Sequence, residues 1–276
     1  NESRGKSCIV IMGEKDKVEM EDEIRDKVGK NKNTRIVCRN GNPIDMNDLS
    51  IVNLDSARSI IIISGEGDNS DADVIKTMLA ITNNPLRKAS PYHIVAEIRD
   101  PKNMDVAKIV GKDEVELVLV GDLISRVIAQ TCRQSGLSVV YTELLDVEGD
   151  EIYFTNAEEL IGKKYGDILS MYEDSSVMGI SLSNGTAILD PPMDRIIEKS
   201  DKIVLISEDD STIKMSKDIT PKIDKGAIVT GVEMQSKPEK TLILGWNWRA
   251  TTIINELDNY VAPGSTVFVV ADVDNG

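Results

Sequence analysis

The sequence predicts an α/β fold with a parallel sheet, followed by a smaller α+β lobe. Short β-branched runs alternate with segments of helical length, which is the pattern of βαβ units. Aromatic residues make up only 4% of the chain, so its cores must depend on Ile, Val and Leu. That composition favours buried parallel strands over a β-sandwich.

Strands and helices alternate regularly in the first half of the chain. The expected strands are 7–13, 34–38, 59–64, 92–98 and 115–120. The expected helices are 16–30, 45–52, 71–81, 103–110 and 122–135, with Asp45 as an N-cap. Connections of this kind form a doubly wound sheet of the Rossmann type. Strand 59–64 (SIIIIS) is apolar throughout, so we expect it to be buried on both faces.

The pattern changes after the helix 122–135. A hinge at Gly136 leads through a mixed region to a strand at 152–155 and a β-rich lobe that ends in the buried strand KIVLIS. A polar stretch then precedes a new strand, helix and strand at 241–244, 250–260 and 266–272. We therefore predict a Rossmann-like lobe at 1–135, a crossover and small lobe at 136–210, a linker at 211–240 and the start of a second Rossmann-like unit at 241–276.

The first expected strand, 7–13, resembles the second strand of a doubly wound sheet, because no strand-turn-helix precedes it. The first lobe is thus expected to lack its first strand. The unit at 241–276 is also unfinished, so we expect the sequence to be an excerpt from a longer chain with tandem domains.

Composition excludes several classes of protein. The net charge of −15 argues against nucleic acid as a partner and against docking on an anionic membrane through a basic patch. No apolar run approaches the roughly 18 residues of a membrane-spanning helix. Cys8, Cys38 and Cys132 lack the spacing of a zinc site and are expected to be reduced, buried thiols.

Catalytic motifs are absent from the sequence. Gly-x-Ser-x-Gly and the P-loop pattern do not occur, and the single histidine, His93, has no nucleophile motif beside it. The protein is therefore predicted not to be an enzyme.

Two sets of residues resemble a known family. The small lobe, from LIGKKYGDI at 160–168 to SDKIVLISE at 200–208, resembles the C-terminal lobe of RCK domains, the ligand-sensing modules of ion channels and potassium transporters. The nearly continuous run from 35 to 64, with RNGNP at 39–43, together with ILGW at 243–246, resembles the Castor/Pollux family of channels.

The resemblance implies a cytosolic gating ring of paired RCK domains, attached to a tetrameric cation-conducting pore in the same chain. It also implies regulation by calcium. The helix 122–135 would be the crossover that packs against a partner subunit, although its apolar stripe also fits packing on its own sheet.

Acidic residues follow two neighbouring strands of the predicted sheet. Asp68 and Asp71 come after strand 59–64, while Glu97 and Asp100 come at and after the end of strand 92–98. The carboxyl ends of parallel strands line one crevice, and calcium prefers oxygen ligands of this kind. In related calcium-gated potassium channels, acids at matching positions bind calcium. Arg99 departs from that pattern and is expected to compete by pairing with Glu97, which leaves Asp71 as an ordinary acid at a helix start.

A nucleotide-sensing subunit of a potassium transporter is the alternative function. Dinucleotide binding needs a glycine-rich turn before the helix, but the turn at 245–249 reads GWNWR, with tryptophans at its second and fourth positions. Cofactor binding in this second unit is therefore disfavoured, and an oxidoreductase is the least favoured interpretation.

Overall fold

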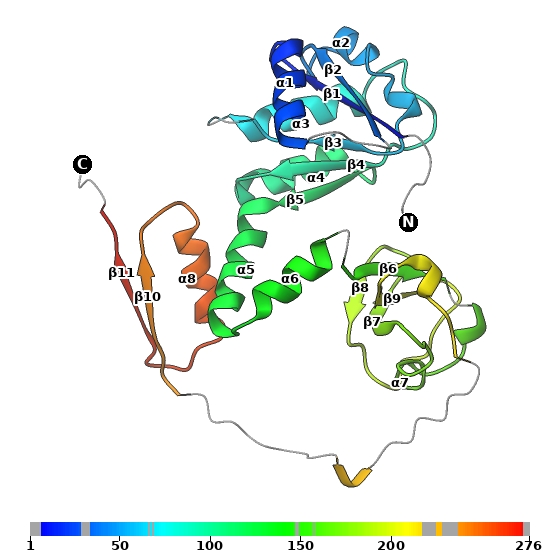
Figure 1. Ribbon diagram of the computed structural model, residues 1–276, viewed down its shortest axis with the longest axis vertical. Coiled ribbons are helices and arrows are strands. Elements are labelled where there is room, and N and C mark those ends of the chain that lie inside the picture. The colour runs from blue at the N-terminus through cyan, green and yellow to red at the C-terminus, as the bar shows by residue number, and fades with distance from the viewer. Residues whose placement is uncertain are drawn as a thin grey trace. The chain divides into compact units, whose positions relative to one another are not determined.

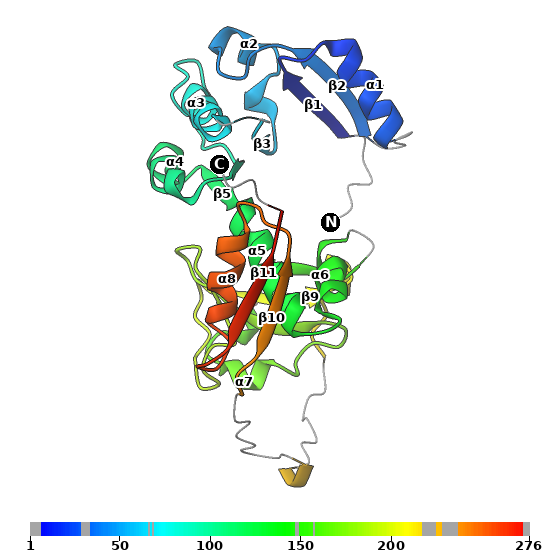
Figure 2. The ribbon, with the colours of Figure 1, turned by 90° about the vertical axis from the view of Figure 1, so that its left-hand side faces the viewer.

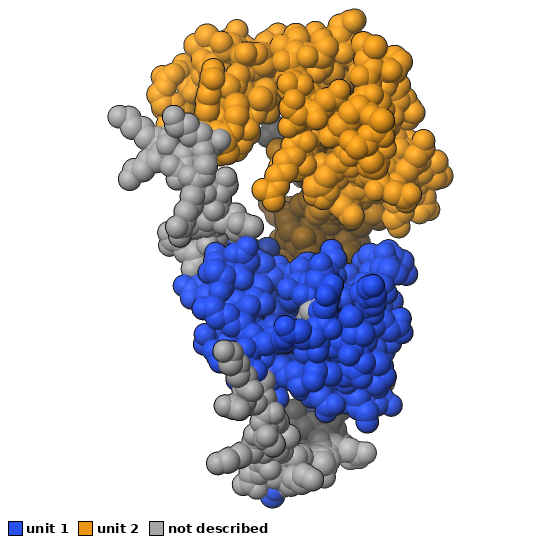
Figure 3. All heavy atoms as spheres, turned by 90° about the vertical axis from the view of Figure 1, so that its right-hand side faces the viewer, with its two compact units in different colours: residues 1, 130–238 blue, residues 2–129, 239–276 orange. Residues whose placement is uncertain are grey.

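The structure is a computed structural model. It describes residues 7–28, 34–65, 67, 69–146, 149–156, 158–216, 225–227 and 237–272. The chain forms two compact units, one of residues 2–129 together with 239–276 and the other of residues 130–238 (Figure 3). The finer division predicted from the sequence stays a prediction.

In the described part of the first unit, every strand pairing is parallel, as predicted (Figure 1). They are β1 (Ser7–Gly13), β2 (Thr34–Asn40), β3 (Ile60–Ile62), β4 (Ile94–Ile98), β5 (Val115–Leu119), β10 (Lys240–Leu244) and β11 (Thr266–Val270). In the described residues, β1 pairs with β2, and a separate sheet has the order β3-β4-β5. In a doubly wound sheet of order 3-2-1-4-5-6, the second and third strands lie on one side of the first strand and the fourth to sixth lie on the other. The β1-β2 pair matches the first of these sets, and the β3-β4-β5 sheet matches the second.

The helices of this unit fall close to their expected positions. They are α1 (Lys17–Val28), α2 (Met46–Ser50), α3 (Ser70–Thr82), α4 (Met104–Gly111) and α8 (Ala250–Asp258), and α5 (Val120–Arg133) continues into the second unit. Short 3-10 turns occur at Leu54–Ser56 and Pro101–Asn103. Asp45 caps α2 as predicted, because its side chain accepts a hydrogen bond of 2.7 Å from the amide of Asn47.

The main core of this unit forms between α3 and the β3–β4–β5 sheet. Alternate residues of β4 (Ile94, Ala96 and Ile98) are fully buried and pack with Val74 and Met78 of α3. This alternation is the period-2 pattern of a strand with one face in the core.

Strand β3 differs from the expectation of burial on both faces. Ile62 is buried against the core, but Ile61 and Ile63 are 70% and 74% exposed. Neighbouring strand residues point to opposite faces, and in the described part of the chain the second face of β3 is open to solvent. The expectation for the thiols also needs correction, since Cys38 is buried whereas Cys8 and Cys132 are exposed.

The second unit holds an antiparallel sheet of order β6-β9-β7-β8. Its strands are β6 (Glu151–Thr155), β7 (Ser176–Ser181), β8 (Ala187–Leu189) and β9 (Lys202–Ser207), and its helices are α6 (Leu137–Leu145) and α7 (Tyr165–Ile168). Short 3-10 turns lie at Glu158–Leu160, Asp210–Thr212 and Lys225–Ala227. The expected buried strand is the central β9, whose Ile203 and Leu205 pack in the core. Helix α6 was not predicted.

The expected linker at 211–240 lies mostly outside the described residues. Its first residues belong to the small lobe, because Ile213 and Met215 pack against that core and Met215 bridges to Tyr172.

The predicted strand-helix-strand unit near the end of the chain is present. β10 and β11 pair in parallel, with Thr241 opposite Val267, and α8 lies alongside them (Figure 2). Among the described residues, none of the helices combines the length and hydropathy needed to cross a bilayer.

Candidate functional site

The carboxylate of Asp71 lies at the carboxyl edge of the β3–β4–β5 sheet, in the first turn of α3. It is buried and accepts three hydrogen bonds: Oδ1 from the amide of Arg99 at 2.9 Å, and Oδ2 from the amide of Asp100 at 2.9 Å and from Nδ2 of Asn103 at 2.8 Å. Asp71 therefore ties the start of α3 to the segment that leaves β4.

Burial by itself opposes ionisation of Asp71. The hydrogen bonds from Asn103 and from the amides of Asp100 and Arg99 outweigh that cost, and together they lower the pKa of the Asp71 carboxyl. The folded structure therefore stabilises the ionised form of the Asp71 side chain.

The other predicted ligands have separate partners. Glu97 Oε2 accepts a hydrogen bond of 3.1 Å from the amide of Ser64, and Asp100 Oδ1 accepts one of 2.9 Å from the amide of Lys102. The guanidinium of Arg99 donates to the carbonyl of Gly65 at 3.1 Å. The expected pair of Arg99 with Glu97 is not among the ion pairs of the described residues.

Of the predicted acids, Asp71, Glu97 and Asp100 lie at one edge of the sheet without forming a preformed metal site. Within the described part of the chain, no three acidic, histidine or cysteine side chains are grouped so that they could hold a metal ion. Asp68 lies outside the described residues. Chemically, the edge positions the segment 99–103 through a buried carboxylate, and a cation would compete with N–H donors for the Asp71 oxygens.

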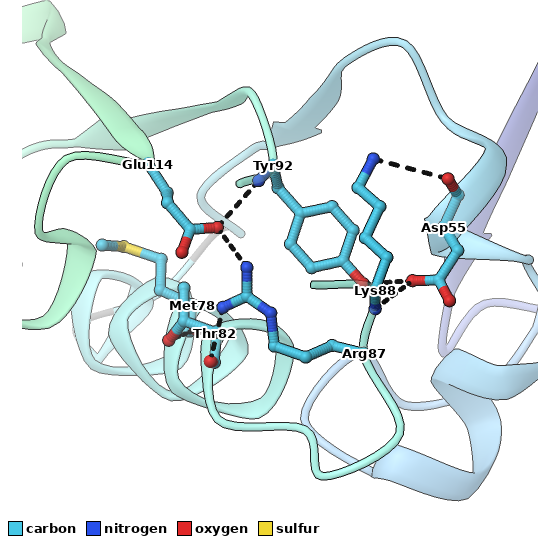
Figure 4. Close-up of polar contacts among 7 residues, drawn as sticks. All are labelled: Asp55, Met78, Thr82, Arg87, Lys88, Tyr92 and Glu114. Atoms are coloured by element: carbon cyan, nitrogen blue, oxygen red, sulfur yellow. Dashed lines mark hydrogen bonds and ion pairs between the residues drawn. The ribbon is translucent and has the colours of Figure 1, made fainter. Parts of the chain in front are cut away.

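A second polar cluster lies at the opposite edge of the same sheet (Figure 4). The hydroxyl of Tyr92 donates to Asp55 Oδ1 at 2.5 Å, and the Arg87 guanidinium pairs with Glu114 Oε2 at 2.6 Å. The Arg87 and Lys88 cations lie 4.8 Å from the centroid of the Tyr92 ring. The cluster holds the loop before β4 against the segments that precede β3 and β5.

Burial, reinforced by the hydrogen bond to Asp55, raises the pKa of Tyr92 to about 12. Sequence reasoning missed this cluster because its members are scattered from position 55 to position 114 and share no motif. The nearby His93 is exposed.

Comparison with known proteins shows which family the chain resembles. Residues 121–224 match the family described as Castor and Pollux, part of voltage-gated ion channel. Over 99% of its length, the chain is 35% identical to the probable ion channel CASTOR of Oryza sativa subsp. japonica and 32% identical to the ion channel CASTOR of Lotus japonicus. The chain is a homologue of the Castor and Pollux channels. It spans about a third of the length of these two relatives, 31% and 32% respectively.

The fold agrees with this Castor/Pollux assignment. The human SLO3 gating ring superposes with a TM-score of 0.63 and 16% sequence identity, over 96% of this chain and 59% of that one. The predicted family resemblance and the predicted α/β fold of the kind found in gating-ring domains are both confirmed. The named relatives are ion channels rather than enzymes, as the lack of catalytic motifs predicted.

Replacing Asp71 with Asn is expected to lower the free energy of unfolding by about 2 kcal/mol near neutral pH, because the new amide nitrogen would face an N–H donor and leave it unsatisfied. Urea-induced unfolding measures the loss. Asp73→Asn is the matched control, since Asp73 lies on the exposed side of α3, and a change within about 0.5 kcal/mol is expected there.

The Asp71 contribution has a predictable pH dependence. Because its folded pKa lies below the ordinary value of 3.8, the contribution is complete above that pH and is lost as pH falls through the folded pKa. The stability gap between wild type and Asp71→Asn should be constant down to about pH 5 and narrow below 3.8. A gap that persists unchanged in stronger acid contradicts this account.

Tyr92→Phe is expected to cost about 1 kcal/mol of unfolding free energy near neutral pH, since it removes the hydroxyl bond to Asp55. The folded pKa of Tyr92 is raised from 10.0 to about 12, so its contribution is present below pH 10 and is lost as pH rises toward 12. Unfolding measured on both proteins should show the gap shrinking above pH 10. An unchanged gap there would argue that Asp55 does not hold the hydroxyl.

Proposed function

We propose that this chain is a ligand-sensing module of the cytosolic gating ring of a cation channel. The observation that carries the proposal is the similarity to a CASTOR channel over 99% of the chain, combined with a gating-ring fold over 96% of it. In this proposal the pore belongs to the same, longer protein, and the ring is built from several copies of the chain.

Calcium is the proposed ligand, and Asp68, Asp71, Glu97 and Asp100 are the residues proposed to bind it at the carboxyl edge of the sheet. Support comes from the placement of Asp71 against residues 99 and 100, which brings acids from two strand ends to one edge. Calcium takes six to eight oxygen ligands, so binding requires additional carbonyls or water.

The hydrogen bonds of Asp71 give the proposal a mechanism. A calcium ion bound by Asp71 would displace N–H donors of the segment 99–103, and that segment would then have to move. Binding shifts the ring toward an open or closed state only if calcium prefers one arrangement of this segment over the other.

Apolar side chains on α5 and α6 support assembly with a second copy of the chain. Leu123 and Ile128 of α5 are exposed, and so are Val139, Val140 and Leu145 of α6. No residue of α6 is fully buried. Apolar helix faces of this kind are typical of subunit interfaces.

Calorimetric titration with calcium tests the ligand. We expect saturable binding with a Kd of about 10⁻⁷ to 10⁻⁵ M, the range of calcium sensors. Glu97→Gln and Asp71→Asn should each weaken binding at least about tenfold, because each removes a charged oxygen ligand. Asp73→Asn makes the same charge change on the exposed side of α3 and should bind like wild type. Equal affinity in all four proteins, or no binding, would rule out this edge as the site.

Val140→Asp is expected to shift the chain toward monomer, since it buries an unpaired charge in the proposed interface. Size-exclusion chromatography with light scattering measures the mass as a function of concentration. Thr142→Asp is the control on the same helix, because Thr142 is an exposed polar residue. The interface is elsewhere if both variants assemble like wild type.

A further inference from the structure

The turn between β10 and α8 is held by hydrogen bonds. Gly245 has a φ of 93°, and its amide donates to the carbonyl of Val270 at 2.7 Å. The side-chain oxygen of Asn247 accepts a hydrogen bond of 2.9 Å from the amide of Arg249. The backbone carbonyl of Asn247 accepts another, of 3.0 Å, from the amide of Ala250. These hydrogen bonds fix the backbone that carries Trp248 just before the start of α8.

The ring of Trp248 lies directly on Gly121 of α5, in the same compact unit. A methyl group at Gly121 would lie 2.3 Å from Cη2 and 2.4 Å from Cζ3 of that ring, far inside van der Waals contact. Only glycine permits this approach. The Arg249 guanidinium lies 5.1 Å from a Trp248 ring centroid and adds a cation–π contact.

An ion pair joins the same two helices further along. Arg126 Nη1 lies 2.9 Å from Glu256 Oε2, and the Glu256 side chain is only 7% exposed. Glu256 also accepts a hydrogen bond of 3.0 Å from the Tyr260 hydroxyl. A buried carboxylate needs such partners. If α8 separated from α5, Glu256 would lose the ion pair with Arg126 and would have to be solvated by water.

The contact with Trp248 adjoins the carboxyl edge of the β3–β4–β5 sheet. A methyl group at Gly121 would lie 3.7 Å from the carbonyl oxygen of Arg99, whose amide donates to Asp71. Asp71, Arg99, Gly121 and Trp248 thus form a continuous series of contacts from the sheet edge to α8.

We infer that the turn 245–249 and α8 are a latch that fastens the β10–α8–β11 unit to the first turns of α5. In dinucleotide-binding domains the corresponding turn is glycine-rich and receives a pyrophosphate. Here Trp248 of the turn packs on Gly121 of the same chain instead. The latch makes the placement of the second β-α-β unit depend on the segment around Arg99, whatever ligand acts at that edge.

Hydrogen exchange measured by mass spectrometry on the whole chain tests the latch. Gly121→Ala should displace the Trp248 ring and raise amide exchange in residues 250–258 by about tenfold. Alanine favours helix over glycine, so a faster exchange cannot arise from the helix propensity of α5. Gly65→Ala is the matched control, because a methyl group there meets no atom within 4 Å, and its α8 should exchange like wild type.

Trp248→Ala removes the ring and leaves α5 unchanged. We expect the same faster exchange in α8, and we expect Gly121→Ala combined with Trp248→Ala to exchange no faster than Trp248→Ala alone, because the clash requires the ring. Wild-type exchange of α8 in Gly121→Ala, or additive effects in the double variant, would overturn the inference.

Discussion

The first unit depends on one electrostatic constraint, the need of a buried carboxylate for N–H donors. Asp71 meets this need with two backbone amides and one side-chain amide, all from the segment that follows β4. The same contacts fix where α3 begins and how the chain leaves the sheet. Because Gly121 adjoins Arg99, they also determine the surface on which Trp248 lies.

Local sequence patterns predicted the regular elements of this unit well. Strand β1 and the cap at Asp45 follow from hydrophobic runs and turn chemistry, which act over a few residues. Helix α6 was not predicted although Leu137, Tyr141 and Leu144 recur at helical spacing, and the exposure of Ile61 was missed because burial depends on what covers a strand. Burial of a strand on both faces is a property of the assembled sheet.

The candidate site shows the same limit. Parallel-sheet geometry predicted acids at one edge, but the sequence alone could not reveal that the Asp71 oxygens would accept hydrogen bonds from the amides of Arg99 and Asp100. Backbone donors carry no sequence signature. The Tyr92 and Asp55 cluster was equally invisible, since it joins residues that are 37 positions apart in the chain.

The fold of this chain is shared by proteins that differ from it much more in sequence than its Castor and Pollux relatives do. Identity of 35% with a CASTOR channel reaches across both units, while the gating-ring fold persists at 16% identity. The fold thus tolerates wide change in sequence.

Trp246 and Trp248 are the two tryptophans of the chain, and both stand in a single five-residue turn. The indole emission of these 276 residues therefore originates at one location. The chain thus carries an optical reporter of its own, readable without any attached dye, at the junction of α5 and α8.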